Sequence, residues 1–380
     1  MLCSNRSSYH LVRRDFFEHE DEHEDDKTLM RWLTRYLRTS EGVILITTLL
    51  LCIVIGFLNP VFLSAANLLD LVRDSITTGI FALAVYVALL SGGIDVSFTA
   101  IAATAMYGSV KLFVLINPHA PLLPILLVAA AIGAILGSIN GLLIAIFRLP
   151  TLIVTLGTLS FFHGFLLTFL GSKHITDIPD SMLDLSRSFL YRGRLADGSL
   201  FSLPTTSLFL IAAIVLVAWL VRFTAFGRYI YAIGGSEVAC SRLGIPVART
   251  KFLIYVLIGV MAGVTGIVHS SQARVANPFD LVGTELNVIA AVVLGGTRIT
   301  GGHGTVFGTL LGVFLVTIIN NSLVLIGISS YWERCVIGAL IILGAGVPLL
   351  LQRFQARRSA LTHPRQNPVQ VPDPRPESNR

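Results

Sequence analysis

The sequence predicts an all-α, polytopic membrane protein with about ten membrane segments, some of them broken or re-entrant. Of its 380 residues, 54% are hydrophobic and only 13% are charged, whereas soluble domains carry about 25% charged residues. The charge is also uneven, since 9 of the 22 acidic residues lie in 1–41. Glycine-dense turns join several apolar runs, which is typical of helices broken inside a membrane bundle. Apolar sequence of this length excludes a globular enzyme with a single anchor.

The chain divides into three regions. We expect a cytoplasmic N-terminal tail over 1–41, a transmembrane domain over 42–351 and a disordered cytoplasmic C-terminal tail over 352–380. The run from His19 to Asp26 could hold a metal, but a solvated acidic tail is favoured because nothing nearby would order it. The four cysteines lack CxxC spacing, so neither a zinc site nor a disulfide framework is expected.

The apolar runs are separated by polar or glycine- and proline-rich turns. A full membrane span needs roughly 20 apolar residues. The second and eighth runs are shorter than this, so we expect them to be tilted, broken or re-entrant. The ten expected segments are 42–59, 75–91, 96–116, 122–146, 151–171, 206–223, 252–271, 284–298, 304–326 and 334–351.

Charges beside the apolar runs set the expected topology. An even number of spans places both termini on one side of the membrane. Three arginines precede the first span and three follow the last, so this side should be cytoplasmic. The connection 222–251 carries five basic residues against one acid, Glu237, and should lie on the same side. The largest outer loop is then 172–205.

A first polar block reads LLSGGIDVSFTA and begins at Leu89. Asp95 is the only acid in the surrounding apolar sequence, and an ionisable group at this depth faces a cavity, a partner or a helix end. Gly92 and Gly93 precede it and can break the helix there. Asp95 is therefore expected to cap the following helix, to contact the solute or a gating partner, or to face solvent in a turn.

Three asparagines also lie in apolar surroundings. Asn140 follows two close-packing glycines, and Asn320 and Asn321 stand in the middle of a helical run. Buried amides need hydrogen-bond partners, so each asparagine is expected to tie helices together or to line a path for solute. The candidate path residues are Asp95, Asn140, Asn320 and Asn321. We expect no catalytic residue and no metal ligand.

A glycine-dense turn joins two apolar runs within Thr284–Ile328. Such backbone survives at membrane depth only when it is buried in protein or lines a wet cavity. The pattern predicts a broken-helix or re-entrant hairpin, and hence a transport path. With the pair in the first block, the expected structural glycines are Gly92, Gly93, Gly295, Gly296, Gly301 and Gly302.

The connection Ala225–Lys251 is expected to be a cytoplasmic loop with a short helix near Glu237–Leu243, ended by Gly244 and Pro246. A short charged helix under a bundle can dock into a groove of a partner. The alternative is an ordinary basic loop that only fixes topology.

Several function classes are disfavoured. The sequence contains no GxxxxGK[ST] phosphate loop, so the chain should not hydrolyse ATP, and we expect it to be no enzyme and to bind no cofactor. Its basic residues are topology signals, so a nucleic-acid partner is not expected. Acids at membrane depth are few, which weakens an ion-coupled secondary transporter, the main alternative. A channel is a third and weaker alternative.

Four motifs resemble a known family in order and spacing. They are GGID-S after Leu89, NGLLIA with P-x-x-I-x-TLGT, the Ala225–Lys251 block, and AAVVLGGTRITGGHGTVFGTLLG with NNSLVLIGISSYW. Together they resemble the permease subunit of bacterial sugar ABC importers of the ribose, xylose, arabinose and galactose type, over 42–351. One departure is Phe98-Thr99, where many relatives have a small residue and glycine.

The resemblance implies a role and a set of partners. It implies the transmembrane subunit of an importer for a simple sugar, in the lipid of the bacterial inner membrane. It implies a second permease, identical or paralogous, a cytoplasmic ABC ATPase that binds ATP and Mg²⁺, and a periplasmic or lipid-anchored sugar-binding protein. The basic block resembles the EAA-type loop that engages the ATPase, although Val238 replaces an alanine. The implied coupling residues are Gly227, Gly235, Glu237, Ala239 and Gly244.

Overall fold

The computed structural model describes residues 40–194, 200–327, 332, 335–336 and 338–339. It is built mainly of helices, which confirms the expected fold class. The longer helices are α2 (Ser40–Leu58), α3 (Ala65–Leu90), α4 (Phe98–Ile116), α5 (Leu122–Gly141), α6 (Thr151–Phe165), α8 (Ser207–Phe223), α11 (Val247–Ala273) and α13 (Val306–Leu325). The shorter elements are η1 (Pro60–Leu63), η2 (Leu142–Ile146), η3 (Leu166–Leu170), α7 (Asp180–Arg187), β1 (Phe189–Arg194), β2 (Leu200–Pro204), α9 (Ala225–Gly235), α10 (Glu237–Arg242) and α12 (Glu285–Leu294).

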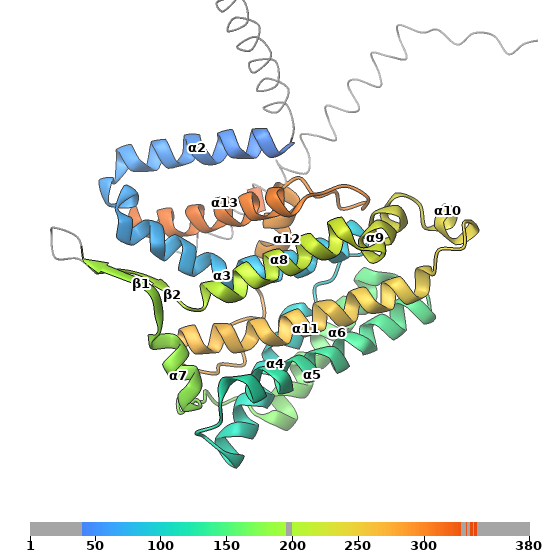
Figure 1. Cartoon of the computed structure of the whole chain (residues 1–380), viewed down its shortest axis with the longest axis horizontal. Helices are drawn as coiled ribbons and strands as arrows, with labels where there is room; N and C mark the ends of the chain where they lie inside the picture. The colour runs from blue at the N-terminus through green and yellow to red at the C-terminus, as the bar shows by residue number, and fades with distance from the viewer. Residues whose placement is uncertain (1–39, 195–199, 328–331, 333–334, 337, 340–380) are drawn as a thin grey trace, which may run out of the picture.

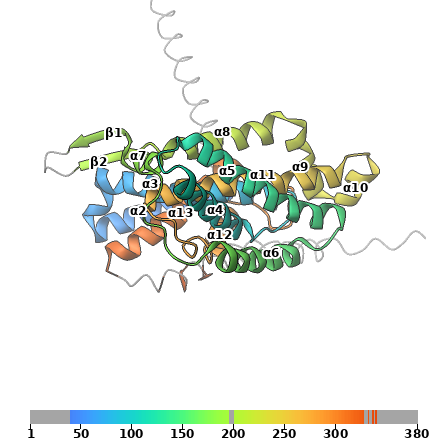
Figure 2. The same ribbon diagram turned by 90° about the horizontal axis from the view of Figure 1, so that it is seen from below.

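The bundle has two distinct ends. Helices α9 and α10 lie at one end, called here the α10 end, and α7 with the β1–β2 hairpin lies at the opposite end, called the hairpin end (Figures 1 and 2). Helix α2 lies along one edge beside α13 (Figure 1). The Thr305 hydroxyl donates a hydrogen bond to Glu41 at the start of α2. The described part of the chain therefore begins at the α10 end.

Seven of the described helices are long and apolar enough to cross a membrane. A possible eighth span is α8 with α9, which are bent by 74° at the break between them. All of the first nine expected segments coincide with helices. The eighth segment is the ten-residue α12, which is too short to span alone, as its sequence predicted. The tenth, 334–351, lies almost wholly outside the described residues.

Helix α3 corrects one expectation. The segment expected at 75–91 is not short, because α3 has 26 residues and starts at Ala65, where the Ser64 hydroxyl accepts a hydrogen bond from the backbone N–H of Asn67. Asp70, Arg73 and Asp74 precede the expected start, yet they belong to the first turns of the helix. Polar side chains on a buried helix mark the side that meets water or polar partners.

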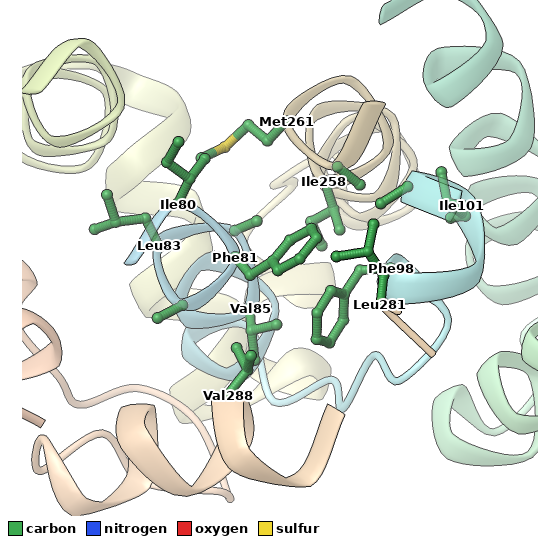
Figure 3. Close-up of a cluster of buried hydrophobic side chains, with 14 of the residues drawn as sticks. Ile80, Phe81, Leu83, Val85, Phe98, Ile101, Ile258, Met261, Leu281 and Val288 are labelled. Atoms are coloured by element: carbon green, nitrogen blue, oxygen red, sulfur yellow. The ribbon is translucent and has the colours of Figure 1, made fainter. Parts of the chain in front are cut away.

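The core lies where α3, α4, α11 and α12 meet. Every residue of α3 from Gly79 to Leu90 is buried, so this half of the helix is enclosed on all sides. The rings of Phe81 and Phe98 pack with their centroids 5.0 Å apart, and Leu281 and Val288 belong to the same buried cluster (Figure 3). Because Phe98 is the first residue of α4, this helix begins beside the middle of α3.

Helices α5 and α11 approach each other through glycine. A Cβ on Gly133 would lie 2.1 Å from the carbonyl oxygen of Gly259, and a Cβ on Gly137 would lie 2.3 Å from that of Tyr255. Only residues without a side chain allow two helix backbones to pack this closely. The small residues before Asn140 therefore form the close-packing face that the sequence indicates.

The connection 172–205 is more structured than expected. It contains α7, which places Met182 and Leu185 in the interior, and the antiparallel β1–β2 hairpin. An isolated bridge pairs Ile175 with Ala276 in the connection after α11. The short alternating segments of the hairpin are a weak sequence signal beside long apolar helices, so they were not anticipated.

Candidate functional site

A cavity of about 370 Å³ lies between α3, α11, α12 and the connection that precedes α12. Its polar lining includes the side chains of Arg73, Asp74, Thr77, His269, Gln272 and Asp280. Phe81, Leu281 and Val288 provide an apolar wall, which is part of the core cluster in Figure 3. A pocket of a few hundred Å³ with an apolar wall and a few polar groups has the form of a small-molecule site.

The polar lining has both used and unused hydrogen-bonding groups. Gln272 is held in place, because its Nε2 donates to the Thr206 hydroxyl at 3.0 Å and its Oε1 accepts from Thr77 at 3.4 Å. In contrast, Nε2 of His269 has no hydrogen-bond partner in the described structure and lies 3.9 Å from Oδ2 of Asp280. Nε2 of His269 therefore remains a buried polar atom without a partner beside the cavity.

Asp95 and Asn140 meet in a buried polar cluster instead of this cavity. Both the N–H and the hydroxyl of Ser97 donate to Asp95 Oδ1 at 2.7 Å, and Asn140 Nδ2 donates to the Ser97 hydroxyl at 2.7 Å. Their side chains are 1% and 0% exposed. The chain of bonds ties the extended segment before α4 to α5. Ser97 is the residue before α4, so Asp95 stabilises the helix start through Ser97.

Asn320 and Asn321 lie on α13, and neither lines the cavity. Oδ1 of each amide is buried and has no hydrogen-bond partner in the part of the chain that the structure describes. No tie between helices through these oxygens is therefore seen within the described residues.

The basic block forms two short helices at the α10 end. Thr224 caps α9 by accepting the N–H of Gly227, and Ser236 caps α10 by accepting the N–H of Ala239. A Cβ on Gly227 would lie 2.2 Å from the Val221 carbonyl oxygen, so this glycine permits the bend between α8 and α9. The structure confirms a helix near Glu237–Leu243 and adds α9, which the sequence interpretation treated as loop.

Helix α10 is fixed to α11 by an ion pair. Lys251 Nζ lies 2.6 Å from Glu237 Oε2, and the Glu237 side chain is 54% exposed. Gly244, with φ of +78°, ends α10 in a conformation that suits glycine. Val238 and Leu243 are 63% and 79% exposed, so α10 presents apolar side chains at this end of the bundle.

Three chain segments meet at a glycine junction, defined here by Gly92, Gly234, Gly301 and Gly302. The N–H of Gly302 donates to the Leu90 carbonyl oxygen at 2.9 Å, joining the turn after α12 to the end of α3. A Cβ on Gly234 of α9 would lie 2.0 Å from the same oxygen and 2.3 Å from the Gly302 nitrogen. No larger residue fits there without displacing backbone.

A second set of bonds joins the same three segments. The Tyr231 hydroxyl of α9 donates to the Gly304 carbonyl oxygen at 2.8 Å. The Tyr86 hydroxyl of α3 lies 3.0 Å from the Tyr231 hydroxyl and 3.3 Å from the same carbonyl. Helix α9 therefore cannot move far without moving α3 or the turn between α12 and α13.

The other expected structural glycines also lie at tight places. A Cβ on Gly93 would lie 2.6 Å from the Tyr255 hydroxyl, and one on Gly295 would lie 2.5 Å from the Gly308 carbonyl oxygen. Gly296 has φ of +89°. These contacts hold α12 against α13 and the segment after α3 against α11, as expected for broken helices packed inside protein.

The start of α12 is bound to the start of α4. The buried carboxylate of Glu285 accepts hydrogen bonds from the Thr99 hydroxyl and from the Gly283 N–H. Thr99 stands where the sugar-permease resemblance departs from its usual pattern. In this chain its hydroxyl therefore pairs with a carboxylate on a neighbouring segment.

Comparison with known proteins decides the family. A family model described as the branched-chain amino acid transport system / permease component matches residues 67–345. The chain belongs to this permease family. It is thus a multi-pass protein of the bacterial inner membrane, and together with the sugar permeases described next the match confirms the resemblance seen in the motifs.

Several curated permeases are similar over most of their length. The ribose import permease protein of Bacillus subtilis is 37% identical over 294 residues, which cover 77% of this chain and 88% of the relative. The probable ABC transporter permease protein YphD of Escherichia coli is 34% identical, covering 87% and 95%. The galactose/methyl galactoside import permease protein of Salmonella typhimurium is 32% identical, covering 85% and 96%. No solved structure matches the chain.

Sequence reasoning missed the cavity of this permease but had a signal for it. Four polar residues of α3 are spaced one, three and four positions apart, so they lie on one face of the helix. They are Arg73, Asp74, Thr77 and Thr78. A polar face on an otherwise buried helix points to water or a ligand. Sequence reasoning also named Gly235 as a coupling residue and omitted its neighbour Gly234. A Cβ added to Gly235 would meet nothing within 4 Å.

Proposed function

We propose that this permease is the membrane-spanning subunit of an ABC importer that carries a simple sugar, such as a pentose, a hexose or a small polyol. The curated relatives are named as ribose and galactose import permeases, and their similarity covers 77% and 85% of this chain. A separate ATPase would bind ATP and Mg²⁺ and power transport, since this sequence has no phosphate loop.

One observation carries the mechanism: each helix that lines the cavity is joined at its other end to α9 or α10. Helix α3 lines the cavity from Arg73 to Phe81 and meets α9 at Leu90, about 14 Å beyond Phe81 at 1.5 Å per residue. Helix α12 starts at the cavity and leads to the glycine junction. Helix α11 ends at the cavity and is paired to α10 through Lys251.

This arrangement supports a mechanical coupling. We place the α10 end in the cytoplasm because of its basic residues. The exposed part of α10 would dock on the ATPase, and closure of the ATPases would push α9 and α10. The glycine junction and the Lys251–Glu237 pair would pass that displacement to α3, α11 and α12, and so change access to the cavity.

The remaining sequence candidates take supporting roles in this proposal. Asp95 and Asn140 would hold the start of α4 beside the path instead of binding solute. Asn320 and Asn321, whose amide oxygens are buried and do not line the cavity, would act inside the bundle instead of binding solute. A sugar-binding protein would deliver solute at the hairpin end, opposite the ATPase.

Reconstitution of the permease with its ATPase and binding protein in liposomes tests the proposal. We expect sugar uptake that needs ATP and all three components. Uptake by this chain alone, driven by an ion gradient and independent of ATP, would establish the ion-coupled alternative instead.

The docking role of α10 has its own test. Glu237→Leu removes an exposed charge and the pair with Lys251, and we expect it to weaken co-purification of the ATPase. Because exposed ion pairs contribute only about 0.2–1 kcal/mol to stability, the bundle should remain folded and monodisperse. Undiminished recovery of the ATPase with this variant would remove α10 from the interface.

A further inference from the structure

We propose that the cavity itself binds a neutral, polyhydroxylated solute, with a solute hydroxyl bridging His269 and Asp280. This inference rests on the proposed function and specifies where and how the solute is held. It assigns direct recognition to the permease, in addition to any recognition by a binding protein.

The gap between His269 and Asp280 fits a hydroxyl group. The two side chains lie 3.9 Å apart from Nε2 to Oδ2, too far for a direct hydrogen bond. One hydroxyl oxygen placed about 2.8 Å from each atom would span this distance at an angle near 90°. It would donate to the carboxylate and accept from the imidazole N–H, using both of its hydrogen-bonding capacities.

Both groups are free for this task. Nε2 of His269 is covered by protein and has no partner in the described structure, so the imidazole would turn toward the cavity to meet the solute. Asp280 uses its other oxygen, Oδ1, to accept a hydrogen bond from Asn277. That bond orients the carboxylate and leaves Oδ2 directed to the histidine side. A buried polar atom without a partner is costly and gains most from a ligand that satisfies it.

The rest of the cavity matches a sugar better than an anion or an apolar solute. Thr78 adds a hydroxyl group, and Thr77, whose O–H is donated to Gln272, adds an acceptor; an apolar ligand would leave both unused. The Phe81 ring and Val288 offer an apolar wall for the C–H face of a sugar ring. The charged side chains that line the cavity are Arg73, Asp74 and Asp280. Their summed formal charge is not positive, so an anionic solute is disfavoured.

The connection that carries Asp280 is fixed at the hairpin end. Arg274 donates to the Ser186 hydroxyl of α7 at 3.0 Å, and the Ile175–Ala276 bridge ties it to the segment before α7. The carboxylate is therefore presented by a connection that is anchored to α7 and to the segment before it. Preorganised groups lose less freedom when a ligand binds.

Direct binding to the full-length permease in nanodiscs tests this inference. Saturation-transfer NMR with D-ribose, D-galactose and myo-inositol would measure half-saturation, and L-leucine would serve as a solute without several hydroxyls. We expect at least one polyol to bind and Asp280→Asn to raise its half-saturating concentration about tenfold, because a charge-assisted hydrogen bond is replaced by a weaker neutral one.

A matched control separates the cavity from general surface effects. Asp184→Asn makes the same chemical change on an exposed position of α7, outside the cavity, and should leave half-saturation within about twofold. If Asp280→Asn fails to fold, Thr78→Val removes a lining hydroxyl at nearly constant volume and should weaken the same polyol several-fold.

The outcomes distinguish the two proposals. The cavity assignment would be overturned if neither Asp280→Asn nor Thr78→Val changed polyol binding. If sugar uptake were still driven by ATP, the importer proposal would stand. Leucine binding as well as the polyols would also overturn the cavity assignment. Polyol binding that depends on Asp280, without ATP-driven uptake of any sugar, would support the cavity and refute the importer.

Discussion

The glycine junction predicts a severe effect for the smallest possible substitution, Gly234→Ala. The new methyl carbon would lie 2.0 Å from the Leu90 carbonyl oxygen and 2.3 Å from the Gly302 nitrogen. Ordinary contact begins at 3.4 Å, so α9 must withdraw by about 1.4 Å or the other two segments must separate. The methyl group would press on both the donor and the acceptor of a 2.9 Å hydrogen bond and would disrupt it.

The cost can be estimated from two effects. Overpacking of a close contact costs about 1–3 kcal/mol, and a buried donor left without its acceptor costs about 1–3 kcal/mol. The gain from alanine over glycine within a helix is only about 0.5–1 kcal/mol. We therefore expect a net loss of about 1–5 kcal/mol in the free energy that holds α9 at the junction.

Transport and assembly should respond differently to Gly234→Ala. The exposed surface of α10 is unchanged, so the ATPase should still co-purify, whereas the displaced α9 should reduce ATP-driven uptake in proteoliposomes at least tenfold. The control is Gly157→Ala on α6, where a Cβ meets nothing within 4 Å. Uptake and thermal stability of Gly234→Ala equal to those of the control would refute the coupling through the junction.

Four further substitutions test other contacts. Tyr231→Phe removes the 2.8 Å bond to Gly304 and should lower uptake several-fold, whereas Tyr86→Phe leaves that bond and should have the smaller effect, as measured by initial uptake rates. Thr99→Val leaves the buried Glu285 carboxylate with one donor fewer and should lower stability by about 1–3 kcal/mol in thermal unfolding. Gly133→Ala places a Cβ 2.1 Å from a facing carbonyl oxygen and should lower the thermal midpoint more than Gly157→Ala does.

The sequence predicted the membrane fold well because long apolar runs have few alternatives in lipid. A helix is the one structure that satisfies the backbone of an isolated apolar run, so nine segments could be placed within a few residues at most ends. The exception is the start of α3, which was expected at 75 and lies at Ala65. Asp70, Arg73 and Asp74 instead belong to a helix that meets a polar cavity.

The candidate site was only partly predictable because contacts between distant segments have no local signature. The glycine doublets marked the junction, since Gly92 and Gly301 both adopt positive φ there. Nothing in the sequence near Tyr86 or Tyr231 indicated that their hydroxyls would meet, 145 residues apart. Asp95 was singled out for its charge, and it binds Ser97, only two positions away. The distant member of that cluster is Asn140, which reaches it through Ser97.

The strength of the junction suits a device that must open and close. Three hydrogen bonds hold the junction: one is donated by the Gly302 N–H, and the Tyr86 and Tyr231 hydroxyls can each donate one. Together they contribute about 1.5–4.5 kcal/mol to its stability. Reversing a two-state equilibrium from 1:99 to 99:1 takes about 5.5 kcal/mol. A junction of glycines and shared hydroxyls can therefore be shifted by docking and closure of a partner, whereas the apolar contacts around Phe81 and Phe98 would keep α3 and α4 together during the movement. The same reasoning explains why close backbone approach, instead of large interlocking side chains, joins α9 to the bundle.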